Sequence, residues 1–449
     1  MTTPVSYARR LGLFSGTMAV IGGIIGSGIF ATPNVVAQRV GTAGLALGTW
    51  IVGGLIALAG AYCYGELGER MPKAGGQYVY LRDAFGPLSG FLYAWALLLI
   101  MATGAAAFVA VTFANYTVAL LGLPPGAVMP LAIGAIVLVC AINYVGVAPG
   151  AITQNIFTLL KLAALAVLIV VGVAFAVHAA GPSALPPERP SAPVGVNGVV
   201  LAVGAALVPV LFTYGGWQQT NFLAEEMVEP ETNLPRALLL GVVVVIAVYL
   251  LANIAYLRVL GIAGLAATPA PAAEVMARVL GPGGRVVISA GIALSAFGFL
   301  DLVVLVTPRV FQAMAADGVF FRRMAELHPT YRTPGAAIVL MGAWAIVLTL
   351  TKTYGPLTDY VVFGDWIFFG SSVATLFVYR QRERATGKVA ALKFRTPGYP
   401  LVPALFVLAA IYVVASSVRQ NPGNAAKGAG LLLLGVPVFF AWRRRGALR

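Results

Sequence analysis

The chain has 449 residues, of which 60% are hydrophobic and only 10% charged, and its mean hydropathy is +0.91. This composition excludes an ordinary water-soluble domain. Apolar runs of about 20 residues recur from end to end, and they are continuous rather than alternating, which excludes a transmembrane β-barrel. The sequence therefore predicts an all-α polytopic membrane protein in contact with the lipid bilayer.

Twelve spans are predicted in chain order, over residues 13–38, 43–69, 88–120, 127–146, 150–178, 198–226, 235–261, 284–315, 335–353, 357–380, 400–419 and 427–442. With the N-terminus inside, 20 of the 29 Lys and Arg residues fall on the cytoplasmic side and 8 on the outer side. Positive residues gather on the cytoplasmic side of membrane proteins. Both termini are therefore predicted to be cytoplasmic, in a plasma or inner membrane, and the net charge of +14 does not call for a nucleic-acid partner.

The first span contains the stretch IGGIIGSGIF (21–30), in which four of ten residues are glycine. Glycine is among the poorest helix formers, so the helix is predicted to break near Gly26, about 20 Å into the span. Unwound backbone at this depth is tolerated where it lines a cavity. The N–H groups of Ser27 and Gly28, at the start of a half-helix, would then be placed to hold a carboxylate.

The fifth span carries Lys161, about 17 Å from the start of the span at residue 150. An ammonium group this deep is costly and is a functional residue by default. The membrane surface is too far away for the lysine to reach it easily. The sequence therefore predicts a functional rather than a surface-seeking lysine.

The sixth span has a second weak point, the pair Gly215–Gly216 at its centre. Unwinding over Phe212–Gly215, which includes Thr213 and Tyr214, would free carbonyls that accept hydrogen bonds from an ammonium group. Each break opens a block of five spans, and an odd number makes the two blocks run in opposite directions. Interrupted spans at matching positions of inverted halves point to a transporter binding site. Together the two breaks fit a zwitterion, such as an α-amino acid.

Close packing between helices is the alternative for the first break, because Gly22 and Gly26 have the spacing of small-xxx-small packing motifs. The matching break in the sixth span favours a binding site over packing alone.

Acidic residues in or beside the spans receive separate hypotheses. Asp301 is expected to pair with a cation or to face the cytoplasmic vestibule, with a proton role as a further possibility. Glu225 and Glu226 are expected to anchor an inner gate. Asp365, in FGDWIFFG (363–370), has no assigned role. Between the spans, 181–193 is predicted to be a proline-rich outer loop and 267–284 a short outer helix.

Four stretches of the chain resemble the amino acid–polyamine–organocation transporter superfamily, and specifically its L-type amino acid transporter branch. They are GGIIGSGIFATP (22–33), YGELGERMPKAGGQYVYL (64–81), FTYGGWQQTNFLAEEMVEPETNLPRA (212–237) and SAFGFLDLVVLVTPRVFQAMAADGVFF (295–321). The resemblance implies a single transmembrane domain over 1–449 with a LeuT-like fold. In it, an inverted repeat of five helices each (13–178 and 198–380) would be followed by two peripheral helices (400–442), with helices 1 and 6 broken.

The resemblance also implies roles for single residues. Ser27 and Gly28, after the break at Gly26, would bind the substrate carboxylate. The carbonyls of Ile24, Phe212 and Gly215 would hold the amino group, with Phe212 as an outer gate over the substrate. Tyr249 would help to shape the pocket.

The resemblance further places Lys161 where sodium sits in sodium-coupled relatives, with Ser295 as its contact on the eighth span. It therefore implies sodium-independent transport, as an exchanger or as a proton-coupled symporter. In animal members an outer-loop cysteine holds a heavy subunit. Here that loop, LGLPPGAV (121–128), has no cysteine, so no disulfide-linked heavy subunit is expected. No cofactor and no metal are expected either.

Other functions are weighed against amino acid transport. An intramembrane enzyme would need a convergent nucleophile–base set or metal ligands, and the two histidines both lie at span ends. A channel would want an open polar pathway. A transporter of cationic amino acids or polyamines should place a carboxylate in the pocket, and neither break contains one. The sequence therefore favours neutral L-amino acids.

Overall fold

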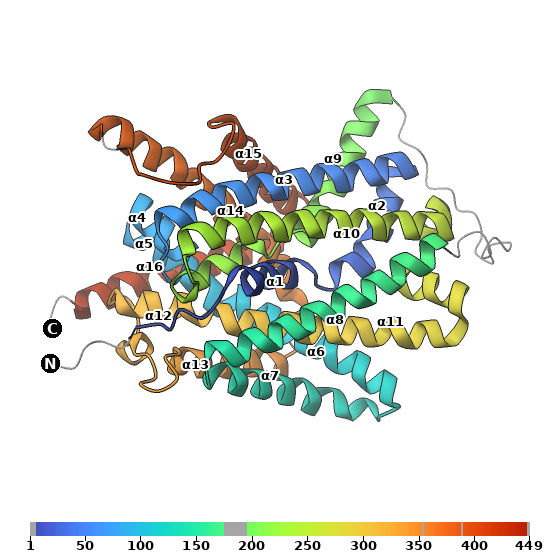
Figure 1. Ribbon diagram of the computed structural model, residues 1–449, viewed down its shortest axis with the longest axis horizontal. Helices are drawn as coiled ribbons and strands as arrows, with labels where there is room; N and C mark the ends of the chain where they lie inside the picture. Colours follow the sequence, from blue (N-terminus) through green and yellow to red (C-terminus); the bar gives the residue numbers. More distant parts are fainter. Residues whose placement is uncertain (1–5, 175–194, 353, 388, 447–449) are drawn as a thin grey trace.

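The computed structural model describes residues 6–174, 195–352, 354–387 and 389–446, and most of its long helices run lengthwise along one bundle (Figure 1). The end of the predicted fifth span (175–178) and the predicted outer loop 181–193 lie outside the described residues. The chain before the first helix and the C-terminal end of the last one lie at the same end of the bundle, on the left of Figure 1.

The helices follow the predicted spans closely. They are α1 (Leu13–Ile24), α2 (Gly28–Val40), α3 (Ala43–Arg70), α4 (Gln77–Phe85), α5 (Pro87–Ala96), α6 (Ala102–Leu121), α7 (Val128–Tyr144), α8 (Val147–Ala174), α9 (Gly195–Thr213), α10 (Pro230–Ala267), α11 (Pro271–Val306), α12 (Pro308–Ala316), α13 (Gly335–Leu350), α14 (Tyr354–Thr386), α15 (Leu401–Gln420) and α16 (Pro422–Gly446). Shorter segments are the π-helix η1 (Leu97–Met101) and the 3₁₀ helices η2 (Pro125–Ala127), η3 (Trp217–Glu226) and η4 (Arg322–Ala325).

Within the described residues, nine helical stretches are long and apolar enough to cross a membrane, and the bent pair α1–α2 makes ten. The predicted spans 335–353 and 357–380 correspond to α13, which is shorter, and to α14, which is not among the ten. The structure thus confirms an all-helical polytopic architecture in this part of the chain.

Several helices extend beyond or bend within the predicted spans. The helix α10 begins five residues before its predicted start at 235 and departs from helical geometry at Gly261, and α11 does so at Gly281. The residues of α11 before Gly281 form the short helix predicted over 267–284. Apolar composition marks the membrane-embedded part of a helix, whereas polar ends can continue the same helix outside it.

The first helix occupies the middle of the bundle. It packs against α8, α10 and α11 and against the 3₁₀ helix η3, so the glycine-rich end of α1 is surrounded by protein. This arrangement lets non-helical backbone exist at the depth of the membrane, because the freed polar groups meet other protein groups instead of lipid.

Candidate functional site

The predicted break in the first span is confirmed. Helix α1 ends at Ile24, α2 begins at Gly28, and the two helices are bent by 44°. Among the described residues, the N–H groups of Ser27, Gly28 and Ile29 donate no hydrogen bond. The first turn of a helix leaves such N–H groups free, and they favour an anion.

The sixth span also breaks, but in a different way. Helix α9 ends at Thr213, the next three residues form a turn, and the chain continues as the 3₁₀ helix η3. Gly216 has a φ of +110°, which favours glycine. The Phe212 carbonyl, which was expected to be free, accepts a hydrogen bond from the Gly215 N–H at 3.0 Å, because the chain turns tightly here.

The two breaks meet in the middle of the bundle. A Cβ atom on Gly216 would stand closer than 3.0 Å to the Gly23 carbonyl oxygen, nearer than real Cβ atoms approach. The hydroxyl groups of Thr32 and Thr213 join the two halves at 2.8 Å. The two backbones can therefore touch because positions 23 and 216 are both glycine.

The predicted pocket residue Tyr249 contacts both breaks through its hydroxyl group. Its hydroxyl donates to the carbonyl of Ile24 at 3.0 Å and has a second acceptor, the Thr213 carbonyl, at 3.3 Å. The Ile24 carbonyl also accepts from the Gly26 N–H at 2.9 Å. Both acceptor sites of the Ile24 carbonyl are therefore in use.

Lys161 is fully buried and holds the first break directly. Its ammonium group donates to the carbonyls of Gly22 at 3.1 Å and Ile25 at 2.9 Å. Ser295 does not bond to the lysine; its hydroxyl donates to the same Ile25 carbonyl at 3.4 Å. Lys161, the first break and the eighth span thus lie together as predicted. The Ile25 carbonyl accepts from both Lys161 and Ser295.

Asp301 differs from both expectations for it. It is fully buried, so it does not face a vestibule, and in the described part of the chain it forms no ion pair. Its carboxylate accepts a hydrogen bond from the Asn143 amide at 2.8 Å. A neutral amide of α7, rather than a cation or the water of a vestibule, is therefore its hydrogen-bond partner.

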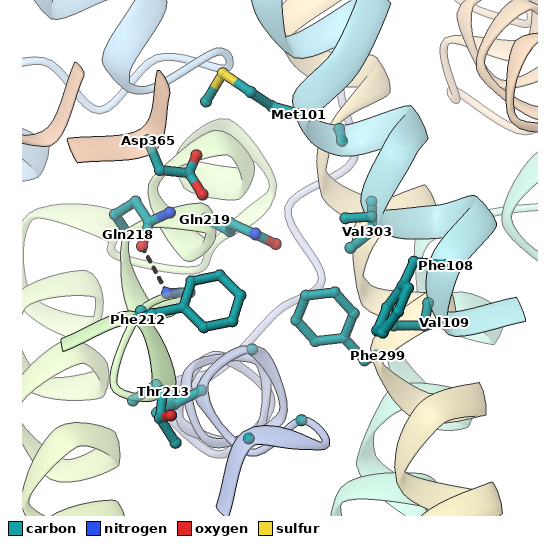
Figure 2. Close-up of a pocket in the computed structure, with 18 of the residues that line it drawn as sticks. Met101, Phe108, Val109, Phe212, Thr213, Gln218, Gln219, Phe299, Val303 and Asp365 are labelled. Atoms are coloured by element: carbon teal, nitrogen blue, oxygen red, sulfur yellow. Dashed lines mark hydrogen bonds between the residues drawn. The ribbon is translucent and has the colours of Figure 1, made fainter. Parts of the chain in front are cut away.

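A cavity of about 450 Å³ opens beside the two breaks. Of the predicted residues, it is lined by Ile24, Gly26, Ser27, Gly28, Phe212, Thr213 and Gly215. The rings of Phe212 and Phe299 face one another across it (Figure 2). This volume lies in the usual range for small-molecule sites.

Tyr214 and Tyr249 do not line this cavity. The Tyr214 ring is 1% exposed and packs against Trp50 and Tyr249, with ring centroids 5.7 Å and 5.1 Å apart. The direction of a side chain depends on how other helices pack around it, so the sequence did not show that these two residues stop short of the cavity.

Other lining residues were not found from the sequence. Met101 belongs to the π-helix η1, and such segments are frequent at functional sites. Gln218, Gln219 and Asp365 line the cavity on the side opposite Thr213 (Figure 2). For Asp365 a signal existed, since an acidic residue inside an apolar span is a functional hypothesis by default.

A buried ion pair joins the end of η3 to the start of α12, and neither of its residues lines the cavity. Arg309 of α12 donates to both carboxylate oxygens of Glu226, at 2.7 and 3.2 Å, and both side chains are almost fully buried. The chain before α1 closes over the pair, because the N–H groups of Arg10 and Leu11 donate to the Glu226 carbonyl at 2.9 Å.

A multi-pass helix bundle whose two broken helices meet beside a cavity is typical of secondary transporters. The family model for amino acid permeases matches residues 11–438. The chain belongs to this family, whose members are transporters and not enzymes.

Curated relatives resemble the chain along most of its length. The large neutral amino acids transporter small subunit 2 of Homo sapiens is 32% identical, over 97% of this chain and 81% of that protein. The serine/threonine exchanger SteT of Bacillus subtilis is 31% identical, over 98% of both chains. The b(0,+)-type amino acid transporter 1 of Mus musculus is 30% identical, over 93% of this chain and 84% of that protein.

Proposed function

We propose that this chain carries amino acids across a cell membrane by alternating access, and that neutral L-amino acids are its substrates. The observation that carries this proposal is the contact of the two breaks beside one cavity, with unpaired amides at one of them. Family membership supports the transport of amino acids.

The substrate carboxylate binds at the amides of Ser27 and Gly28, where the start of α2 favours negative charge. The ammonium group binds on the side of the second break, at the carbonyls of Gly215 and Phe212. Ile24 forms part of the cavity wall but does not bind the ammonium group, since its carbonyl already accepts two hydrogen bonds. Phe212, which is 44% exposed, closes the cavity as a gate.

Transport is independent of sodium in this proposal. Lys161 supplies an ammonium group at the carbonyls of Gly22 and Ile25, and Ser295 completes this group. A resident ammonium group takes the place of a cation at these oxygens. The chain then works as an exchanger or as a proton-coupled symporter.

The architecture that goes with this mechanism has twelve spans. They form two inverted repeats of five (13–178 and 198–380) and two peripheral helices (400–442), in a plasma or inner membrane with both termini in the cytoplasm. The buried pair of Glu226 and Arg309 forms the cytoplasmic gate. The chain needs no disulfide-linked heavy subunit, because the loop 121–128 lacks a cysteine.

The test is uptake of radiolabelled leucine by liposomes that contain the purified protein, with sodium or with choline as the only external cation. We expect equal, saturable uptake under both conditions and none in protein-free liposomes. Uptake that needs sodium would contradict the role of Lys161, and no uptake of any amino acid would contradict the transport proposal. Comparing liposomes preloaded with leucine with empty ones under a proton gradient separates exchange from symport.

Gly28→Val is the matched variant for the binding site. A Cβ atom at Gly28 would stand 2.8 Å from the Thr213 side chain, so valine would displace the start of α2. We expect leucine binding to be lost while the protein still elutes as a single folded species. Unchanged binding would remove the first break from the site.

A further inference from the structure

The cavity contains a carboxylate that the proposed binding of a neutral zwitterion does not use. Asp365 is the only charged side chain among the residues that line the described cavity. Its carboxylate lies on the opposite side from Thr213, beyond the rings of Phe212 and Phe299 (Figure 2).

No protein group within the described ranges compensates this carboxylate. Asp365 takes part in no hydrogen bond or ion pair there. Tyr93 also lines the cavity, but its hydroxyl donates to the Gln77 side-chain oxygen at 2.8 Å. Lys161 is engaged at the first break and does not line the cavity.

The wall around Asp365 is polar on one side only. Gln218 and Gln219 lie beneath it in Figure 2, whereas Met101 and Val303 are apolar. The Gln218 side-chain oxygen is held by the Gly216 N–H at 3.0 Å, and the Gln219 side-chain oxygen has no hydrogen-bond partner in the described part of the chain. The Gln218 oxygen is therefore occupied, whereas the Gln219 oxygen and the Asp365 carboxylate are two acceptors on this side of the cavity that lack a donor among the described residues.

We propose that Asp365 forms the end of a side-chain subsite in the same cavity, which gives preference to amino acids whose side chain ends in an ammonium group. This inference rests on the proposed function, since the two breaks must hold the α-carboxylate and α-ammonium groups first. Asp365 is half-buried, and an unpaired carboxylate that is partly withdrawn from water is costly. A charge-assisted hydrogen bond from the ligand lowers that cost.

The structure thereby widens the substrate class to dibasic amino acids alongside neutral ones. From the sequence, neutral substrates alone were favoured, because neither break contains a carboxylate. The carboxylate is present on a third element, α14, whose rotation about its axis only the fold reveals.

The test compares the binding of lysine and norleucine to the purified protein, measured by competition with radiolabelled leucine. The two ligands have the same unbranched side chain except for the terminal ammonium group. In the wild type we expect lysine to compete at least about tenfold better than norleucine, as one charged hydrogen bond allows. Cadaverine, which is lysine without its carboxylate, should compete poorly because it cannot use the first break.

Asp365→Asn keeps the size of the side chain and removes its charge. We expect the preference for lysine over norleucine to fall at least about tenfold, with norleucine competition reporting that the variant is folded. Glu274→Gln, which removes a partly exposed carboxylate paired with Arg278 far from the cavity wall, should keep the wild-type ratio.

A wild type that does not prefer lysine to norleucine, or an Asp365→Asn protein with an unchanged ratio, would overturn the subsite alone. A wild type that binds neither leucine nor lysine would instead contradict the proposed function. Cadaverine competing as well as lysine would overturn the dibasic amino acid as the preferred ligand, in favour of a polyamine.

Discussion

Both breaks interrupt a helix in the middle of the bundle, but they are stabilised in different ways. At the first break the chain leaves the helix for three residues and returns to an α-helix, and a side chain from α8 holds the released carbonyls. At the second break the chain turns at Gly216 with a φ of +110° and continues as a 3₁₀ helix. The first break is held by a charge, and the second by backbone geometry.

This difference indicates that the two halves of the site have different roles. The first break keeps N–H groups free for an anion, which requires that its carbonyls be satisfied elsewhere, and Lys161 does this. At the second break, the Gly215 N–H donates to the Phe212 carbonyl, so this carbonyl needs no cation from another helix. If this is right, the first break depends on the Lys161 ammonium group and the second on the absence of a side chain at Gly216.

The largest effect is expected for Gly216→Ala. A Cβ atom would meet the Gly23 carbonyl oxygen at an impossible distance in a backbone conformation that alanine avoids. Strain and overpacking together cost about 3 kcal/mol, so leucine uptake per protein should fall at least about 100-fold. Gly44→Ala, where an added Cβ atom meets nothing within 4 Å, is the control. Wild-type uptake by Gly216→Ala would show that the breaks need not touch.

Lys161→Met should have the next largest effect. It leaves the carbonyls of Gly22 and Ile25 without their buried donor, at a cost of about 1–3 kcal/mol for each unsatisfied group. We expect leucine uptake to fall about 10- to 100-fold and the melting temperature to drop. Lys427→Met, on the exposed surface of α16, should change neither quantity. Full activity of Lys161→Met would mean that the first break holds its shape without a charge.

Tyr249→Phe should have the smallest effect of the three. Its hydroxyl is the link to a carbonyl of each break, and a net hydrogen bond contributes about 0.5–1.5 kcal/mol. The affinity for leucine should therefore weaken about 3- to 10-fold, measured by competition binding. Tyr116→Phe, on α6, serves as the control. A variant that binds leucine more tightly would indicate that the freed Ile24 carbonyl takes the ammonium group.

Much of the fold could be predicted because membrane spans are read from composition. The second predicted span, 43–69, differs from α3 (Ala43–Arg70) by one residue. Glycine content likewise predicted the break near Gly26, since the local preference and the fold agree there.

The direction of side chains within the site could not be predicted in the same way. Tyr214 turns away from the cavity because Trp50 and Tyr249 pack around it, and these come from helices far apart in sequence. Asp365 faces the cavity because of how α14 is rotated against its neighbours, and the sequence of α14 does not fix that rotation. The 3₁₀ form of η3 was missed for a related reason, since local propensity did not distinguish it from an α-helix.

The most direct measurement is an experimental structure of the protein with bound leucine. We expect ligand density between the breaks, with the carboxylate within hydrogen-bond distance of the main-chain nitrogens of Ser27 and Gly28. The ammonium group should lie against the carbonyls of the turn that follows Thr213. Leucine bound elsewhere, or α1 and α2 joined as one straight helix, would contradict the proposed binding site.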